Sequence, residues 1–380
     1  MGVRAVPSQA EYTEMMSTAT LQSASPRTIL RWCTIAKTIA ISIALGLASS
    51  LSHASPAAVP VIASCTLIDT DFDLDDLMAI PLVVGSRKVA AIVVTEGVVK
   101  ADVGAAALVR FIADTQQRAL PVIVGVSTEL PDAEIDRQWG YFLPDSRRMM
   151  HRGLGLGLPQ AVQQRPASAL NLQQLQKVLS DCQQVDVLLL GPYSSFVQYS
   201  PLIRRRIGQV VIMGKPVPGE DEGAPAKLPF NCSYDLAACE LATKTQLPGL
   251  SHAFVDVPRT AMDGKARGHD AQVYGPTLAM VQGLASTGLA GRLRQALLGT
   301  VPSGSLGEGV PGPDYWAIDC CLRRSGKSLL WDPMAALYLV RPELFSQVGG
   351  PESPFETRLS PGQIRQVWTE ASNRAASDRP

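Results

Sequence analysis

The sequence has few charged residues and no excess of either sign. Its 380 residues carry 34 Lys and Arg against 34 Asp and Glu, so the formal net charge is zero, and charged residues make up 18%. No cluster of Lys and Arg alternates with aromatic residues, so a nucleic-acid partner is not expected. Because 46% of the residues are hydrophobic, the chain can bury a substantial core.

Cysteine spacings typical of a metal site are also missing. The chain has seven cysteines; Cys320 and Cys321 are adjacent, and Cys232 and Cys239 are seven apart. No disulfide framework can be read from these spacings.

The apolar stretch at 38–51 is too short for a comfortable membrane span. Arg27, Arg31 and Lys37 precede it, and Ser-His-Ala, ending at Ala54, follows it. This pattern is typical of a secretory signal cleaved after Ala54, although the long segment before it leaves an uncleaved anchor as an alternative. The predicted organisation is a disordered segment at 1–26, a signal-like segment at 27–54, a linker at 55–60, a globular domain at 61–370 and a tail at 371–380.

The most informative stretch runs from Leu67 to Ile80, LIDTDFDLDDLMAI. An apolar run leads into closely spaced aspartates, and apolar residues then resume at helical spacing, so the pattern predicts a strand, a tight turn and a helix. The helix dipole contributes only about 0.3–1 kcal/mol per acid, too little to offset so many like charges. A hard cation with oxygen ligands, Ca²⁺ or Mg²⁺, is therefore expected. The aspartates are Asp69, Asp71, Asp73, Asp75 and Asp76.

Two other acidic motifs share part of this pattern. An EF-hand loop requires Gly and Glu where this chain has Leu74 and Ile80, which excludes that motif. Phosphatases with an aspartyl nucleophile also place Asp-x-Asp after an apolar strand, and Asp69 would then carry the phosphoryl group. Asp73 replaces the residue usual after the second Asp, so the phosphatase stays a weaker alternative.

Apolar runs alternate with helical patterns along the rest of the chain. This alternation predicts an α/β fold with an open, mostly parallel Rossmann-like sheet and helices on both faces. The predicted strands lie at 88–95, 120–125, 185–190, 209–214 and 253–257, and the predicted helices at 101–113, 168–182 and 274–298.

The acidic stretch and three later motifs together resemble the inosine-uridine preferring nucleoside hydrolase family. LLLGPYSSF, ending at Phe196, is similar to the family's strand and Gly-Pro turn, and QVVIMG, ending at Gly214, is similar to its Val-Val-x-Met-Gly strand. Phe230-Asn231-x-x-x-Asp235 is similar to a family Asn motif, and Trp331-Asp332-Pro to its His-Asp-Pro motif. The Trp-Asp form resembles purine-selective members, and the family fold agrees with the α/β prediction.

The resemblance implies a role for each matching residue. A Ca²⁺ ion would be bound by Asp71, Asp76, Asp332 and the Leu190 carbonyl, and Asp71 would also act as the general base. Asp75 and Asn231 would accept hydrogen bonds from ribose hydroxyls or donate hydrogen bonds to them. Asp69 would hold the acidic loop in place without binding the ion itself. Trp331 and Trp139 would stack on the base.

Two departures affect the sugar contacts. Pro229 stands in place of a family glutamate at the sugar's 5′ end. Val98 stands where a polar residue is usual, and Glu96 is a candidate to compensate.

The resemblance implies a Ca²⁺-dependent hydrolase that cleaves the N-glycosidic bond of ribonucleosides, with a preference for purines. A ribosyl-ligand-binding protein without efficient catalysis, or a secreted bacterial effector of the same fold, is the alternative. The expected partner is a small nucleoside or ribosyl substrate, with no nucleic acid, no stable membrane span after processing, and a homo-oligomer left open. The signal-like segment predicts an exported, periplasmic or secreted protein, with delivery to a host or a membrane anchor as alternatives.

Overall fold

The computed structural model describes residues 64–113, 115, 120–127, 170–216, 229–256, 278–298, 331–347 and 353–376. The segments expected to be disordered, signal-like or a linker lie outside these ranges, as does Trp139. Within the part of the chain that the structure describes, no helix has the length and apolar character to cross a bilayer.

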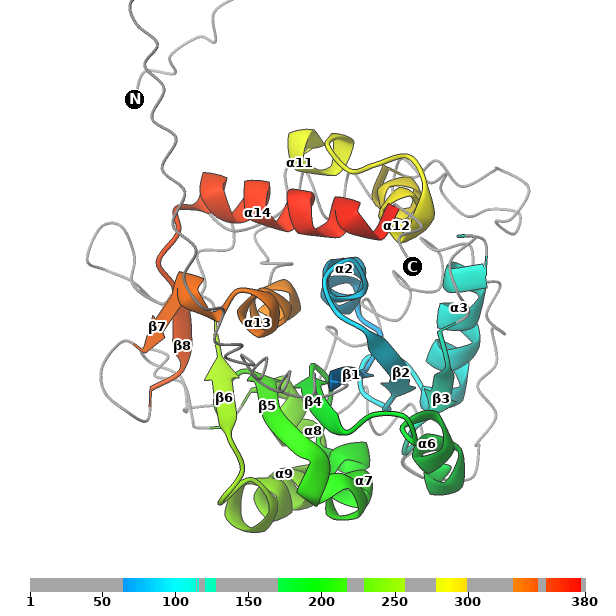
Figure 1. Ribbon diagram of the computed structural model, residues 1–380, viewed down its shortest axis with the longest axis vertical. Helices are drawn as coiled ribbons and strands as arrows, with labels where there is room; N and C mark the ends of the chain where they lie inside the picture. Colours follow the sequence, from blue (N-terminus) through cyan, green and yellow to red (C-terminus); the bar gives the residue numbers. More distant parts are fainter. Residues whose placement is uncertain are drawn as a thin grey trace, which may run out of the picture. The chain divides into compact units, whose positions relative to one another are not determined.

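The described residues form one eight-stranded sheet with helices on both sides (Figure 1). The strands are β1 (Ser64–Thr70), β2 (Val89–Val94), β3 (Val122–Val124), β4 (Gln184–Leu189), β5 (Ile207–Met213), β6 (His252–Val255), β7 (Phe345–Gln347) and β8 (Phe355–Thr357). The α-helices are α2 (Leu74–Val84), α3 (Ala101–Ala113), α6 (Leu172–Val178), α7 (Ser194–Ile203), α8 (Phe230–Tyr234), α9 (Leu236–Leu241), α11 (Leu278–Gln282), α12 (Gly288–Leu298), α13 (Trp331–Val340) and α14 (Pro361–Asn373). Shorter turns are η1 (Arg204–Arg206), the π-helix η2 (Ala242–Gln246), η5 (Pro342–Leu344) and η6 (Arg374–Ala376).

The sheet confirms the predicted fold class. The strand order is β3-β2-β1-β4-β5-β6-β8-β7, and every pair is parallel except β7 with β8. The chain leaves β1 toward β2 and β3 and then returns to pair β4 with β1. Open α/β sheets bind ligands at such a switch point, beyond the carboxyl ends of the strands.

Successive side chains along the strands point to opposite faces of the sheet and pack into two separate hydrophobic cores. Ile68 and Leu188 face the core formed with α2, α3 and α11 to α14, while Leu67 and Val187 face the core under α6 to α9. In Figure 1, α2, α13 and α14 lie on one side of the sheet and α7 and α9 on the other. Both faces are therefore covered, which explains why the strands read as continuous apolar runs.

Most boundaries lie close to the predicted ones, and the differences have local causes. The helix expected at 168–182 begins only at Leu172, because the Asn171 side chain accepts a hydrogen bond from the Gln174 N–H and caps it. The sequence did not indicate β7, β8 or α14. The two strands have three residues each, too few to show a period.

Two disulfides hold the core under α6 to α9. Cys65 at the start of β1 bonds Cys182 just before β4, and Cys232 in α8 bonds Cys239 in α9. The first closes a loop with a sequence separation of 117 residues and the second one of 7. In the chain-entropy description these loops correspond to about 5 and about 2 kcal/mol of stabilisation.

Candidate functional site

The acidic loop that follows β1 reverses direction within three residues. Phe72, between Asp71 and Asp73, has a φ of 60°, which places it in the left-handed region. Such a conformation costs a non-glycine residue about 1–3 kcal/mol and is typical of functional loops. The Phe72 side chain is fully buried in the core, so its packing holds the backbone in place. The turn thus leaves Asp71 and Asp73 at the edge of the sheet where the parallel strands end.

Asp76 joins this loop to the first turn of α2. Its Oδ2 accepts a hydrogen bond from the Asp73 N–H at 2.8 Å, and its Oδ1 accepts one from the Thr70 hydroxyl. The carboxylate therefore caps the helix and fixes the end of β1 at the same time.

Asp71 is held by the loop that follows the neighbouring strand β2. Its Oδ2 accepts a hydrogen bond from the Val98 N–H at 3.0 Å. A Cβ atom added to Gly97 would lie 2.2 Å from that oxygen, and one added to Gly191 would lie 2.8 Å from the Asp71 nitrogen. Asp71 is thus enclosed by the glycine backbone of the segments that follow β2 and β4, and a side chain at Gly97 would displace it.

Asp332 reaches the same place from the other end of the chain. It lies in the first turn of α13, and α13 packs along α2. Carboxylate oxygens of Asp75, Asp76 and Asp332 all lie within 4.8 Å of one another. Asp71 is not one of this group of three, although its carboxyl group is near enough to that of Asp76 for charge repulsion to add to burial in raising the Asp71 pKa. Four aspartates separated by up to 261 positions in the sequence therefore form one cluster.

Burial makes this acidic cluster difficult to ionise. Asp71, Asp75, Asp76 and Asp332 are between 0% and 7% exposed. Burial, and then repulsion from neighbouring aspartates, raises the pKa values of Asp71, Asp75 and Asp332 well above their usual range. Burial also raises the pKa of Asp76, although hydrogen bonds from Asp71 and Thr70 oppose that effect. A bound cation is the partner that would let all four ionise together.

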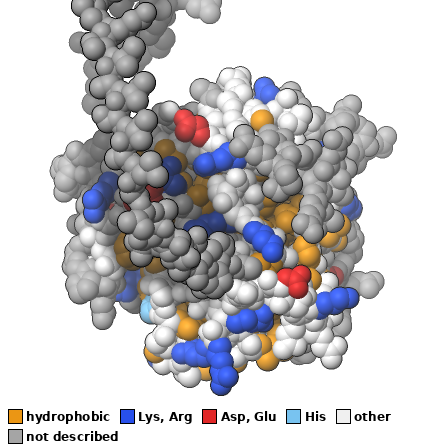
Figure 2. Space-filling view, in the orientation of Figure 1, with side chains coloured by type: hydrophobic (Ala, Val, Ile, Leu, Met, Phe, Trp, Pro, Cys, Tyr) orange, Lys and Arg blue, Asp and Glu red, His pale blue; other side chains and the backbone are white. Residues whose placement is uncertain are grey.

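The donor set fits a hard cation. Within the described residues, no Lys, Arg or His forms an ion pair with the four clustered aspartates. Oδ1 of Asp332 is buried and has no hydrogen-bond partner among those residues. The few acidic side chains visible in Figure 2 are separate surface spots, whereas the cluster is buried. Carboxylates without Cys or His nearby favour Ca²⁺ or Mg²⁺ over Zn²⁺.

Leu190 and Asn231 meet at the end of β4. The Leu190 carbonyl, expected as a metal ligand, accepts a hydrogen bond from the Asn231 side-chain amide. A carbonyl oxygen has two lone pairs, so this bond leaves a second one for a cation. Asn231 is 3% exposed and lies in α8. The structure therefore places Asn231 against a proposed ligand of the ion.

Asp69 lies behind the cluster, within the sheet. Its Oδ1 is 2.5 Å from the Thr95 hydroxyl, and its backbone carbonyl accepts the Leu190 N–H at 2.8 Å. Burial raises the pKa of Asp69 to about 7, although the hydrogen bond from Thr95 opposes this rise. The buried Asp69 carboxylate is hydrogen-bonded to the Thr95 hydroxyl, so Asp69 connects β1, β2 and β4 beneath the acidic loop.

Of the two expected stacking residues, only one is in the described part. Trp331 begins α13, is half-buried, and packs at the edge of the core formed with α2. It directly precedes Asp332, a member of the acidic cluster. Trp139 lies outside the described residues.

Sequence reasoning missed the polar residues that hold the cluster together. Thr70 and Thr95 are buried hydroxyls next to Asp76 and Asp69, and Tyr234 hydrogen-bonds Glu96. Thr70 and Thr95 end apolar strands at the same sheet edge, and such polar residues at strand ends are the signal that could have found them.

Comparison with known families decides which class of protein has this site. A sequence profile described as "Inosine-uridine preferring nucleoside hydrolase" matches residues 66–279, more than half of the chain. The chain belongs to this family. The match contains the acidic loop and Asn231 and ends before Asp332. Membership and fold together support hydrolysis of ribonucleosides, so the chain is an N-ribohydrolase.

Solved structures agree with the family assignment at the level of the fold. A plant nucleoside hydrolase, the PpNRh1 enzyme, is 16% identical with a TM-score of 0.52, covering 82% of this chain and 99% of that one. The effector protein XOO4466 is 16% identical with a TM-score of 0.50, covering 84% and 95%. An inosine-guanosine nucleoside hydrolase is also 16% identical with a TM-score of 0.50, covering 83% and 99%. A search of curated protein sequences gives no match.

Proposed function

We propose that this family member is a Ca²⁺-dependent ribonucleoside hydrolase with a preference for purine nucleosides. The grouping of the buried Asp75, Asp76 and Asp332, with the Asp71 carboxyl group near them, supports the metal requirement. Ca²⁺ accepts mixed carboxylate and backbone-carbonyl ligands in a flexible arrangement, which suits this cluster and the Leu190 carbonyl better than the strict octahedron of Mg²⁺.

The bound ion would supply Lewis acidity and a template for sugar hydroxyls. Asp71, ionised beside the bound cation, is the candidate to take the proton from the attacking water. Asp75 accepts a hydrogen bond from a ribose hydroxyl in this proposal. As the N-glycosidic bond breaks, its electron pair leaves with the base, which takes up a proton from solvent. The positive charge that develops on the sugar is stabilised by the buried carboxylates in a site that needs little reorganisation.

Trp331 supports the purine preference. An aromatic face directly before Asp332 can stack on the larger ring system of a purine, and such stacking contributes about 0.5–1.5 kcal/mol beyond area burial. That range corresponds to roughly 2- to 12-fold in kcat/KM.

The test is release of free base from inosine, adenosine, guanosine, uridine and cytidine. We expect hydrolysis with added Ca²⁺, loss of activity with a chelator, and recovery when Ca²⁺ is restored. Purine nucleosides should exceed pyrimidine nucleosides in kcat/KM, and Trp331→Ala should reduce that ratio by roughly 2- to 12-fold. Chelator-resistant hydrolysis would disprove the metal requirement, and equal rates for both base classes would disprove the preference.

A second candidate is a ribosyl-ligand-binding protein with little turnover. Two observations favour it: the Asn231 amide is engaged by the Leu190 carbonyl, and one similar solved structure is described as an effector protein. Calorimetric binding of nucleosides without any release of base would support this candidate over the enzyme.

We also infer that the protein is exported. The signal-like segment at 27–54 and two disulfides support an oxidising destination, because cytosolic thiols are kept reduced. Expressed in a secreting bacterial host, the mature chain should begin at Ser55 and retain both disulfides. Intact-mass and N-terminal analysis of the extracytoplasmic fraction measures this; a full-length, reduced chain confined to the cytoplasm would contradict it.

A further inference from the structure

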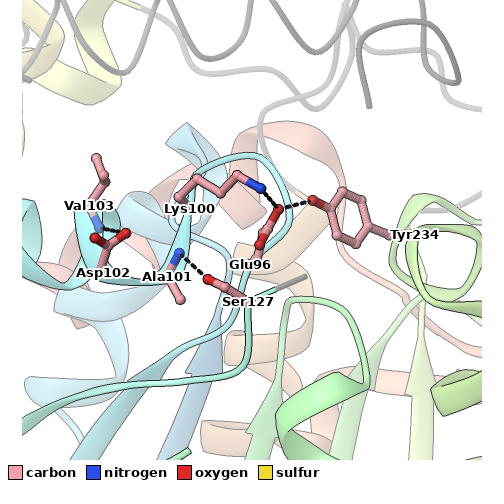
Figure 3. A network of polar contacts seen from close by, with 7 residues as sticks. All are labelled: Glu96, Lys100, Ala101, Asp102, Val103, Ser127 and Tyr234. Carbon is pink, nitrogen blue, oxygen red and sulfur yellow. Dashed lines mark hydrogen bonds and ion pairs between the residues drawn. The ribbon is translucent and has the colours of Figure 1, made fainter. Parts of the chain in front are cut away.

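A buried polar network connects the loop after β2 with α8 (Figure 3). Glu96 Oε1 accepts one bond from Lys100 Nζ at 2.5 Å and another from the Tyr234 hydroxyl at 2.7 Å. The three residues are 1%, 9% and 6% exposed, respectively. An ion pair buried this deeply gains little stability, because removing both charges from water costs about as much as their attraction returns. The residues next to this network, and not its contribution to stability, should therefore explain why it is present.

Both ends of the network adjoin the acidic site. Glu96 directly precedes Gly97, which lies against the Asp71 carboxylate. Tyr234 is three residues after Asn231 in the same short helix, α8. Figure 3 shows the Tyr234 hydroxyl and the Lys100 ammonium pointing at the same Glu96 oxygen from opposite sides. The network thus runs from the loop that encloses Asp71 to the helix that carries Asn231.

The chemistry of a ribosyl group indicates what such a network can recognise. A ribosyl group has two adjacent ring hydroxyls and one primary hydroxyl. In the proposed function the ring hydroxyls are taken by the ion, Asp75 and Asn231, so the primary hydroxyl requires a separate contact. Val98 and Pro229, which lie along the same two segments, offer no polar side chain for it.

We propose that the Glu96–Lys100–Tyr234 network recognises the primary (5′) hydroxyl of the ribosyl substrate. The Glu96 carboxylate accepts a hydrogen bond from the hydroxyl proton, and the Lys100 ammonium donates to the hydroxyl oxygen. Tyr234, which donates its own proton to Glu96, orients the carboxylate. This assignment rests on the proposed function, because it takes the ring hydroxyls to be bound at the acidic cluster.

The experiment compares inosine with 5′-deoxyinosine, which lacks only the hydroxyl in question. In the wild-type protein with Ca²⁺, kcat/KM should favour inosine by roughly 10- to 100-fold, the value of one hydrogen bond to a charged group. In Glu96→Gln and Tyr234→Phe, kcat/KM should fall mainly for inosine. The ratio of kcat/KM for inosine to that for 5′-deoxyinosine should therefore drop several-fold. Tyr234→Phe keeps the aromatic ring and its packing against Phe230.

A structural role would give a different result. If the network only stabilises the loop, both substrates lose activity equally and the ratio stays at the wild-type value, which would overturn the proposal. Ser127→Ala is the matched control, because it removes a hydrogen bond to Ala101 N at 3.3 Å in the same region, outside the network, and should leave the ratio unchanged.

Calorimetric binding of the same two nucleosides separates this proposal from the proposed function. Tighter binding of inosine without turnover would refute the hydrolase and still support the network's role. Equal affinity of the wild-type protein for both nucleosides, or no binding of either, would overturn the network's role whether or not base is released.

Discussion

Asp71→Asn is expected to reduce kcat for base release by roughly 10²- to 10⁴-fold, the contribution typical of a positioned general base. Asparagine has the same size and its carbonyl oxygen can still accept the Val98 N–H, so the enclosing loop should keep its shape. It cannot take up a proton from water at neutral pH. The measurement is kcat for inosine together with the bound-metal content of the variant.

The control for this variant is Asp102→Asn. Asp102 is also an acid in the first turn of a helix, α3, and it hydrogen-bonds the adjacent Val103 N–H. Its replacement should change kcat by no more than about twofold, as for other substitutions outside special sites. If Asp71→Asn keeps wild-type kcat with a full complement of metal, Asp71 is not the base.

The second large effect is expected in the pH dependence of calcium-induced stabilisation. Without metal, burial raises the pKa of Asp69 to about 7 and those of Asp71, Asp75 and Asp332 well above their usual value. The folded protein then binds more protons than the unfolded chain between about pH 4 and pH 7. The stability that these groups contribute is therefore present at low pH and lost as pH rises through that window.

Ca²⁺ should reverse this loss, because it favours the ionised cluster. At 100 to 1,000 times its Kd, the ion should add about 3–4 kcal/mol at pH 7.5, or roughly 6–16 °C in Tm. At pH 5.5 protons compete with the ion, so the increase should be smaller. Tm values measured by calorimetry with Ca²⁺ or with chelator, at both pH values, provide the comparison.

Asp332→Asn is the matched variant for the stability experiment. It removes one buried charge from the cluster without changing the packing of α13 on α2. The variant should lose most of the calcium-induced increase in Tm, and its metal-free form should be less sensitive to pH. The explanation fails if the wild-type increase is the same at pH 5.5 and pH 7.5, or if acidification over this range destabilises the chelated protein.

Local chemistry in the sequence was sufficient to predict the acidic loop and most of the longer elements, but not β7, β8 or α14. The apolar runs at 88–95 and 209–214 became β2 and β5, and the helical pattern at 101–113 became α3 with the same bounds. Such patterns are readable because strand burial and helix amphipathicity repeat within a few residues. Five closely spaced aspartates at the end of an apolar run likewise predict a cation site, because like charges at close range repel one another.

Only the tertiary structure decided which distant residues meet. Packing of α13 on α2 brings Asp332 to Asp76, and pairing of β1 with β4 places Leu190 and Gly191 against the acidic loop. The same holds for Cys65 with Cys182 and for Glu96 with Tyr234, whose spacing in the chain carries no sign of contact. Sequence periodicity records how each segment is buried, whereas these contacts depend on how the sheet orders its strands and how helices pack over it.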